Sequence, residues 1–177
     1  MVAGIASRPA EEAAVAEFLD SAAGAPSALV VEGEPGIGKT TLWLASLELA
    51  RGRGFQVMSA RVATAEAVRA YASLADLLAG VVPAVWAALP DPQRIAVDRV
   101  VSREDAVAPA TDQRAVAAAF LSVIDHLSDD APVLVAIDDL QWLDPSSAYV
   151  IAYAARRLSG PVGFLAAVRT DSDSGCC

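Results

Sequence analysis

The sequence predicts an α/β fold in which helices cover both faces of a mainly parallel sheet of about four strands, giving three layers. Two observations lead to this expectation. Short apolar runs alternate along the chain with segments of helical periodicity, a pattern typical of a parallel sheet with helices packed on it. A glycine-rich turn, Gly33–Gly38, joins the first apolar run to a helix. The 177 residues, 55% of them hydrophobic, are enough for one domain with a substantial core.

The predicted strands occupy residues 28–31, 55–62, 133–137 and 162–168, of which the first and third are short apolar runs. Because the first run is continuously apolar, we expect it to be buried on both faces. The predicted helices that alternate with the strands occupy residues 8–23, 39–51 and 145–158. Asp144 is expected to cap the last of these helices, with Pro145 at its first position.

Residues 64–127 predict a helical insertion between the second and third strands. Prolines divide this segment, and we expect three or four helices with breaks near residues 89–92 and 108–111. We place the domain at residues 1–170 and expect residues 171–177 to form a disordered tail.

Charge and hydropathy exclude several classes of function. The formal net charge of −9 argues against binding to a nucleic-acid backbone, which requires a basic surface. The longest uncharged stretch, residues 77–90, is too short to span a bilayer and contains a central proline. The N-terminus lacks the layout of a signal peptide. We therefore expect a cytoplasmic protein that contacts neither membrane nor nucleic acid directly.

The strongest motif is a phosphate-binding loop that follows the first predicted strand and opens a helix. It reads Gly33-Glu34-Pro35-Gly36-Ile37-Gly38-Lys39-Thr40 and fits the pattern G-x-x-x-x-G-K-[ST]. Its backbone N–H groups and the helix N-terminus are expected to surround phosphates, and Thr41 completes the predicted nucleotide-binding set. Lys39, the only lysine in the sequence, is expected to reach the β and γ phosphates, and Thr40 to hold Mg²⁺.

Charged residues end two of the later strands. Asp138 and Asp139 follow the apolar run at 133–137, where a Walker B motif belongs in a protein with a phosphate loop. We expect Asp138 to hold Mg²⁺ and Asp139 to orient or deprotonate the attacking water. Arg169 ends the last strand, and two interpretations stay open: a sensor of the γ-phosphate, or a partner of a surface acid. Lys39, Asp139 and Arg169 form the predicted catalytic set.

Two further features have structural interpretations. Trp142 is expected to be a packing anchor. Arg156 and Arg157, near the end of the helix at 145–158, fit a solvated helix end that favours cations better than an arginine finger for a neighbouring subunit.

Together these motifs resemble one family. The segments that carry the resemblance are 33–40, 70–78, 88–94, 137–147 and 167–169. They look like the N-terminal ATPase module of the large ATP-binding LuxR-type transcriptional regulators, AAA-like members of the signal-transduction ATPases with numerous domains (STAND). The resemblance implies a three-layer P-loop NTPase with strand order 5-1-4-3-2, of which four strands are present. It implies an ATP-dependent switch that uses ATP or ADP and Mg²⁺.

The resemblance also implies slow hydrolysis, because many ATPases of the broader class have glutamate where this chain has Asp139. The segments that complete the regulators, including the DNA-binding domain, do not follow the last predicted strand. We therefore expect a truncated module that contacts other domains of a parent regulator. We also expect the strand at 28–31 to lie at a sheet edge, which favours self-association and marginal stability.

Three other functions also involve a phosphate loop. A lipid-anchored GTPase ending in Cys176-Cys177 would need an Asn-Lys-x-Asp motif, and the single lysine is already in the phosphate loop. A kinase of small metabolites would need a cluster of basic residues, whereas the arginines of the helical insertion are scattered among acids. A module that binds ATP or ADP without turnover stays open.

Overall fold

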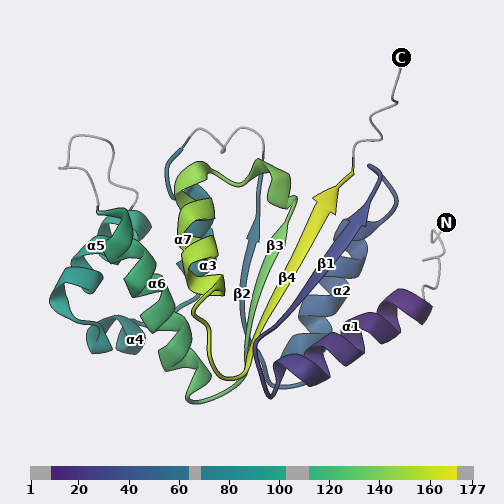
Figure 1. The fold of residues 1–177 in the computed structure, drawn as a ribbon, viewed down its shortest axis with the longest axis horizontal. Helices are drawn as coiled ribbons and strands as arrows, with labels where there is room; N and C mark the ends of the chain where they lie inside the picture. Colours follow the sequence, from purple (N-terminus) through teal and green to yellow (C-terminus); the bar gives the residue numbers. More distant parts are fainter. Residues whose placement is uncertain (1–8, 64–68, 103–111, 171–177) are drawn as a thin grey trace.

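The computed structural model describes residues 9–63, 69–102 and 112–170, which form a four-stranded sheet with helices on both faces (Figure 1). The strands are β1 (Ser27–Gly33), β2 (Gln56–Arg61), β3 (Val133–Asp138) and β4 (Val162–Arg169). They are parallel and lie in the order β1-β4-β3-β2. The α/β fold and the 1-4-3-2 part of the expected strand order are confirmed. Because the strands are parallel, their carboxyl ends share one edge of the sheet.

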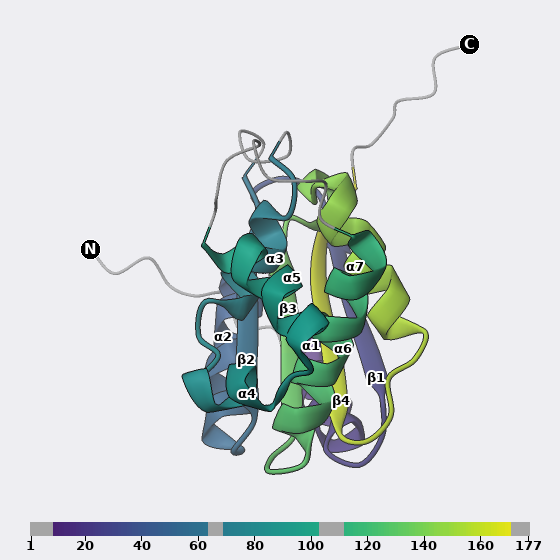
Figure 2. The ribbon, with the colours of Figure 1, turned by 90° about the vertical axis from the view of Figure 1, so that its left-hand side faces the viewer.

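Helices lie on both faces of the sheet (Figures 1 and 2). The first face carries α1 (Pro9–Ala22) and α2 (Lys39–Gly52). The second carries α3 (Ala72–Leu78), α4 (Pro83–Ala88), α5 (Asp91–Val101), α6 (Gln113–Ser128) and α7 (Pro145–Ala155). The predicted insertion therefore contains four helices within the described residues, with the expected break at Leu89-Pro90. The break predicted near 108–111 and the tail at 171–177 lie outside the described residues.

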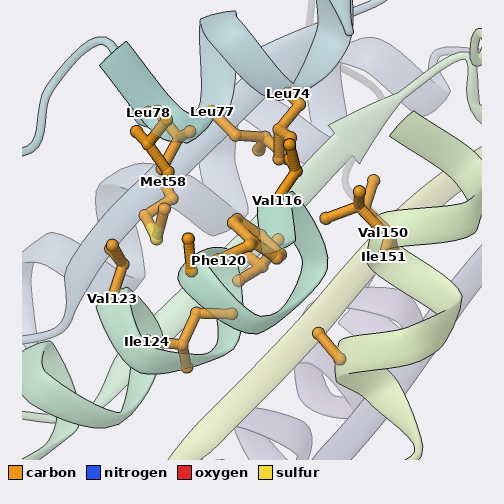
Figure 3. Packing of buried hydrophobic residues seen from close by; sticks show 14 of the residues in the cluster. Met58, Leu74, Leu77, Leu78, Val116, Phe120, Val123, Ile124, Val150 and Ile151 are labelled. Atoms are coloured by element: carbon orange, nitrogen blue, oxygen red, sulfur yellow. The ribbon is translucent and has the colours of Figure 1, made fainter. Parts of the chain in front are cut away.

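Strand β3 is the centre of both hydrophobic cores, and all six of its residues are buried. Successive side chains of a strand point to opposite faces. Val133, Val135 and Ile137 join the core beneath α3–α7, and Leu134 and Ala136 join the core beneath α1 and α2. Figure 3 shows the first core, in which side chains of α3, α6 and α7 gather around β2 and β3. Packing on both faces therefore holds β3 in position, and with it Asp138 and Asp139 at its carboxyl end.

Strand β1 is an edge strand, and the prediction that it is buried on both faces is wrong. Its alternate residues Ala28, Val30 and Glu32 are exposed, Val30 by 51%. Leu29 and Val31 pack against the core beneath α1 and α2. The core beneath α3–α7 includes residues of β2, β3 and β4 but none of β1, so one face of β1 stays in solvent.

Two smaller predictions are also corrected. Helix α7 ends at Ala155 rather than near residue 158, because the chain tightens at Arg156 and the N–H of Arg157 donates to the carbonyl of Ala154 (2.8 Å). Trp142 is 37% exposed and is not a packing anchor. It ends the short 3-10 helix η2 (Leu140–Trp142), from which Leu140 packs against the core instead.

Candidate functional site

The predicted phosphate loop connects the end of β1 to the start of α2 and depends on two left-handed glycines. Gly36 has φ 81° and Gly38 has φ 94°, values that residues with a Cβ rarely adopt. Gly38 is the residue immediately before α2. A Cβ on Gly33 would lie 3.0 Å from the side chain of Ile37, so the loop folds back closely over its first residue. The glycines of the sequence motif therefore lie at positions where the backbone conformation or the close packing of the loop requires glycine.

Lys39 lies beneath this loop and is only 7% exposed. Its Nζ donates to the carbonyl oxygens of Gly33 (2.7 Å) and Glu34 (2.8 Å). Among the described residues, no carboxylate lies within ion-pair distance of this ammonium. A buried cation without an anionic partner is costly. The loop thus presents positive charge and the N-terminus of α2 at one place, which fits a bound phosphate group.

Asp138 ends β3 and is 2% exposed. Its Oδ1 accepts a hydrogen bond from the N–H of Asp139 (3.1 Å), and its Oδ2 lies 3.7 Å from Nε of Arg61. Arg61 reaches it because Arg61 and Asp138 are register partners on β2 and β3. The sequence did not single out Arg61; its position at the end of a predicted strand was the one available signal.

Thr40 and Thr41 follow Lys39 in the first turn of α2, where Thr40 is partly buried and Thr41 is exposed. The residues described contain no group of three or more His, Cys, Asp and Glu side chains that could hold a metal by themselves. One carboxylate and one hydroxyl fit Mg²⁺, which usually takes few protein ligands and completes its coordination with phosphates and water. Asp138 and Thr40 are a donor set of this kind.

Asp139 and Arg169 form a bidentate ion pair across the carboxyl edge of the sheet. Arg169 Nε donates to Oδ1 of Asp139 (2.8 Å) and Nη2 donates to Oδ2 (3.1 Å). Asp139 itself has a left-handed backbone, with φ 57° and ψ 48°. The hydrogen bonds from Arg169 hold the pKa of Asp139 below its ordinary value, and partial burial opposes them. Arg169 therefore pairs with an acid, and that acid is the predicted catalytic one.

Gln141 joins these two residues and was missed by the sequence reasoning. Its Nε2 donates to Oδ1 of Asp139 (3.0 Å), and its Oε1 accepts from the backbone N–H of Arg169 (3.2 Å). Gln141 also lowers the pKa of Asp139, and the positive charge of Lys39 acts in the same direction. The signal in the sequence was the spacing of Gln141 two residues after Asp139.

The sheet brings the predicted residues together at one edge. Gly33 and Arg169 are register partners on β1 and β4, and the N–H of Thr170 donates to the carbonyl of Gly33 (3.1 Å). Asp138 ends β3, the other neighbour of β4, and Asp139 follows it. The loop, the two acids and Arg169 thus lie at the carboxyl ends of three adjacent strands, which is where ligands bind in open α/β sheets.

A second buried acid supports this edge. Asp144 caps α7 as predicted, with Oδ1 accepting from the N–H of Ser147 (2.9 Å). The same carboxylate also accepts from the N–H groups of Tyr71 (2.9 Å) and Ser73 (3.3 Å) at the start of α3. The pKa of Tyr71 is raised by burial and by the charge of Asp144. Asp144 therefore joins the starts of two helices beside the predicted Walker B strand.

The strand order, the glycine loop with its buried lysine and the acidic end of β3 define a P-loop nucleoside triphosphatase fold. The chain belongs to the AAA ATPase domain family, whose family model matches residues 6–165. It is therefore a nucleotide-binding domain of the AAA type.

Two solved structures are similar at low identity. The Aeropyrum pernix ORC2 protein, in ADPNP–ADP complexes, is 18% identical with a TM-score of 0.47. The C. elegans PCH-2 protein is 14% identical with a TM-score of 0.41. The similarity covers 90% and 93% of this chain but 40% and 37% of those proteins. A search of curated proteins found no match. Within residues 9–63, 69–102 and 112–170, no helix is both long and apolar enough to cross a membrane.

Proposed function

We propose that this domain binds ATP and ADP with Mg²⁺, hydrolyses ATP slowly and serves as the nucleotide-controlled switch of a LuxR-type transcriptional regulator. The observation that carries the proposal is the burial and the hydrogen bonding of the Lys39 ammonium. This ammonium is buried, is held by two loop carbonyls and has no carboxylate partner among the described residues. A phosphate at the loop would supply the missing negative charge and accept from the N-terminus of α2.

Each site residue has a role in this proposal. Residues 33–38 surround the phosphates, and Lys39 neutralises the charge of the β and γ phosphates. Thr40 and Asp138 would hold Mg²⁺, which would neutralise charge on the phosphate oxygens. Asp139 orients the attacking water and accepts its proton, and Arg169 donates to the γ-phosphate.

The ion pair between Asp139 and Arg169 supports slow turnover. Both carboxylate oxygens of Asp139 accept from Arg169, so Arg169 must exchange this partner for phosphate before Asp139 can act as a base. Aspartate also reaches less far than glutamate. Hydrolysis therefore requires Asp139 and Arg169 to separate first. Such a step is expected of a nucleotide-controlled switch more than of a fast enzyme.

The same ion pair favours a second candidate, a module that binds nucleotide without turnover. Phosphate release by the wild type, Asp139→Asn and the matched control Asp91→Asn separates the two. Asp91 is an exposed residue of α5 that pairs with Arg94. Slow hydrolysis predicts a low steady release by the wild type and the control, with a loss of about tenfold or more in Asp139→Asn at unchanged nucleotide affinity. Nucleotide binding with release at background in all three proteins would favour the second candidate.

The role in a larger regulator rests on the resemblance of residues 137–147 and on the exposed edge of β1. Strand β1 ends the sheet and pairs only with β4 among the described strands, so the backbone groups on its other side are an edge that another segment can pair with. We propose that residues 1–170 act as a cytoplasmic unit that contacts other domains or a second copy through this edge. Sedimentation with ADP and with a non-hydrolysable ATP analogue tests this proposal, because a switch predicts that the two nucleotides give different association states. Identical monomeric sedimentation with both would contradict it.

A further inference from the structure

A hollow of about 510 Å³ lies on the surface formed by α6 and α7, away from the phosphate loop. The two helices lie side by side on the face of the sheet opposite α1 and α2 (Figures 1 and 2). The described residues that line the hollow are Arg114, Tyr149, Ala152, Tyr153, Arg156 and Arg157. None of them belongs to the loop or to the carboxyl ends of the strands. The volume falls within the range of about 300–1,000 Å³ that is common for small-molecule sites.

Among the described residues, the lining carries three positive charges and no negative one, in a chain whose net charge is −9. Elsewhere, arginines such as Arg51, Arg53 and Arg94 donate to carboxylates at 2.6–2.7 Å. Across the described part of the chain, the three guanidinium groups of the hollow have no carboxylate within ion-pair distance. Three like charges on one concave surface repel one another, and an anion bound among them removes that repulsion.

The helix dipole explains only part of this cluster. Arg156 and Arg157 follow the C-terminus of α7, where cations are favoured. Arg114 is the second residue of α6, and the N-terminal end of a helix disfavours a cation. The preference of a helix C-terminus for cations therefore accounts for Arg156 and Arg157. It does not account for Arg114, which belongs to α6 and lines the same hollow.

Two aromatic rings give the hollow flat walls. The guanidinium carbon of Arg157 lies 3.8 Å from the centre of the Tyr153 ring, and its Nη1 donates to the carbonyl of Tyr153 (3.1 Å). These contacts hold one of the three cations in place. The ring of Tyr149, which is exposed, lines the hollow as well. A guanidinium held in place in this way can donate paired hydrogen bonds to a carboxylate or phosphate group.

We propose that this hollow is a binding site for a small organic polyanion, a molecule with two or more carboxylate or phosphate groups. The site lies apart from the nucleotide loop, and the proposal does not depend on ATP hydrolysis. Arg114 and Arg156 supply charge from two helices, and Arg157 and Tyr153 form the ordered wall. A ligand here would bridge α6 to α7, the helix that follows η2 and the predicted Walker B strand.

Calorimetric titration of the Lys39→Ala protein with citrate and, separately, with pyrophosphate tests the site. The substitution removes the lysine of the phosphate loop, so that heat from phosphate binding at the loop does not mask the hollow. We expect saturable binding of either probe. Tighter binding of citrate would indicate a carboxylate ligand, and tighter binding of pyrophosphate would indicate a phosphate ligand. Adding Arg114→Gln and Arg156→Gln should weaken binding by about tenfold or more.

The matched control adds Arg51→Gln and Arg94→Gln, which change the net charge equally outside the hollow and should leave affinity within about twofold. Unchanged melting midpoints would exclude unfolding as the cause of any loss. The proposal fails if neither probe saturates, or if the pocket and control variants lose affinity equally. It also fails if an acidic peptide such as polyglutamate binds here when both small probes do not, because the hollow would then serve a protein partner.

Discussion

Replacement of Asp144 by alanine should destabilise the domain more than removal of any surface acid. The carboxylate is 1% exposed and accepts from three backbone N–H groups, those of Tyr71, Ser73 and Ser147. Loss of a helix N-cap costs about 1 kcal/mol. Each of the two buried N–H groups left at the start of α3 adds at least about 1 kcal/mol. The free energy of unfolding should therefore fall by about 3 kcal/mol.

A fall of this size corresponds to a decrease in melting temperature of about 6–12 °C in a domain of this length. Asp144→Asn keeps one acceptor oxygen and the cap, so its loss should be nearer 1 kcal/mol. The assay is urea unfolding followed by circular dichroism, with Asp91→Ala as the control. Asp91 is an exposed partner of Arg94, and its removal should change stability by less than about 0.5 kcal/mol. Equal effects of Asp144→Ala and Asp91→Ala would show that the three hydrogen bonds accepted by Asp144 do not stabilise the fold.

Two further predictions concern packing and charge. Gly163→Ala should cost about 1–3 kcal/mol in urea unfolding, because its Cβ would lie 3.0 Å from side-chain atoms of Phe18 and Ala22, whereas Gly52→Ala meets no atom within 4 Å and should be neutral or stabilising. Asp125→Asn should raise the melting temperature at pH 7. Burial and the charge of Asp129 raise the pKa of Asp125, so its ionised form opposes folding. The gain should vanish in acid well below the ordinary carboxyl pKa, where the wild-type group is already protonated; a gain that persists there would contradict this cause.

The parts of the site that the sequence predicted depend on local signals. The glycine pattern after the first apolar run predicts a phosphate loop at the end of a strand. An acid at the end of another buried strand is expected beside that loop, because parallel strands place their carboxyl ends at the same edge of the sheet. The positions of Lys39, Asp138 and Arg169 follow from these rules and from the strand order. Their assignment to nucleotide and metal stays a prediction.

The parts that the sequence did not predict depend on contacts between distant segments or on side-chain orientation. Gln141 reaches both Asp139 and Arg169 because Asp139 adopts a left-handed backbone, which no composition rule predicts. Asp144 could be recognised as a cap for α7, but its bonds to Tyr71 depend on where α3 packs. The exposure of β1 follows from which helices cover each face, and a continuous apolar run does not carry that information.

Calorimetric titration of MgATP and MgADP into the wild type and into Lys39→Ala tests whether the loop at residues 33–40 is the nucleotide site. A folded wild type should bind both nucleotides, and the loss of the one buried ammonium at the loop should weaken binding by about a hundredfold or more. Thermal melting of both proteins provides the folding control. Absence of binding by the folded wild type, or equal affinity of the two proteins, would contradict the assignment of this loop as the nucleotide site.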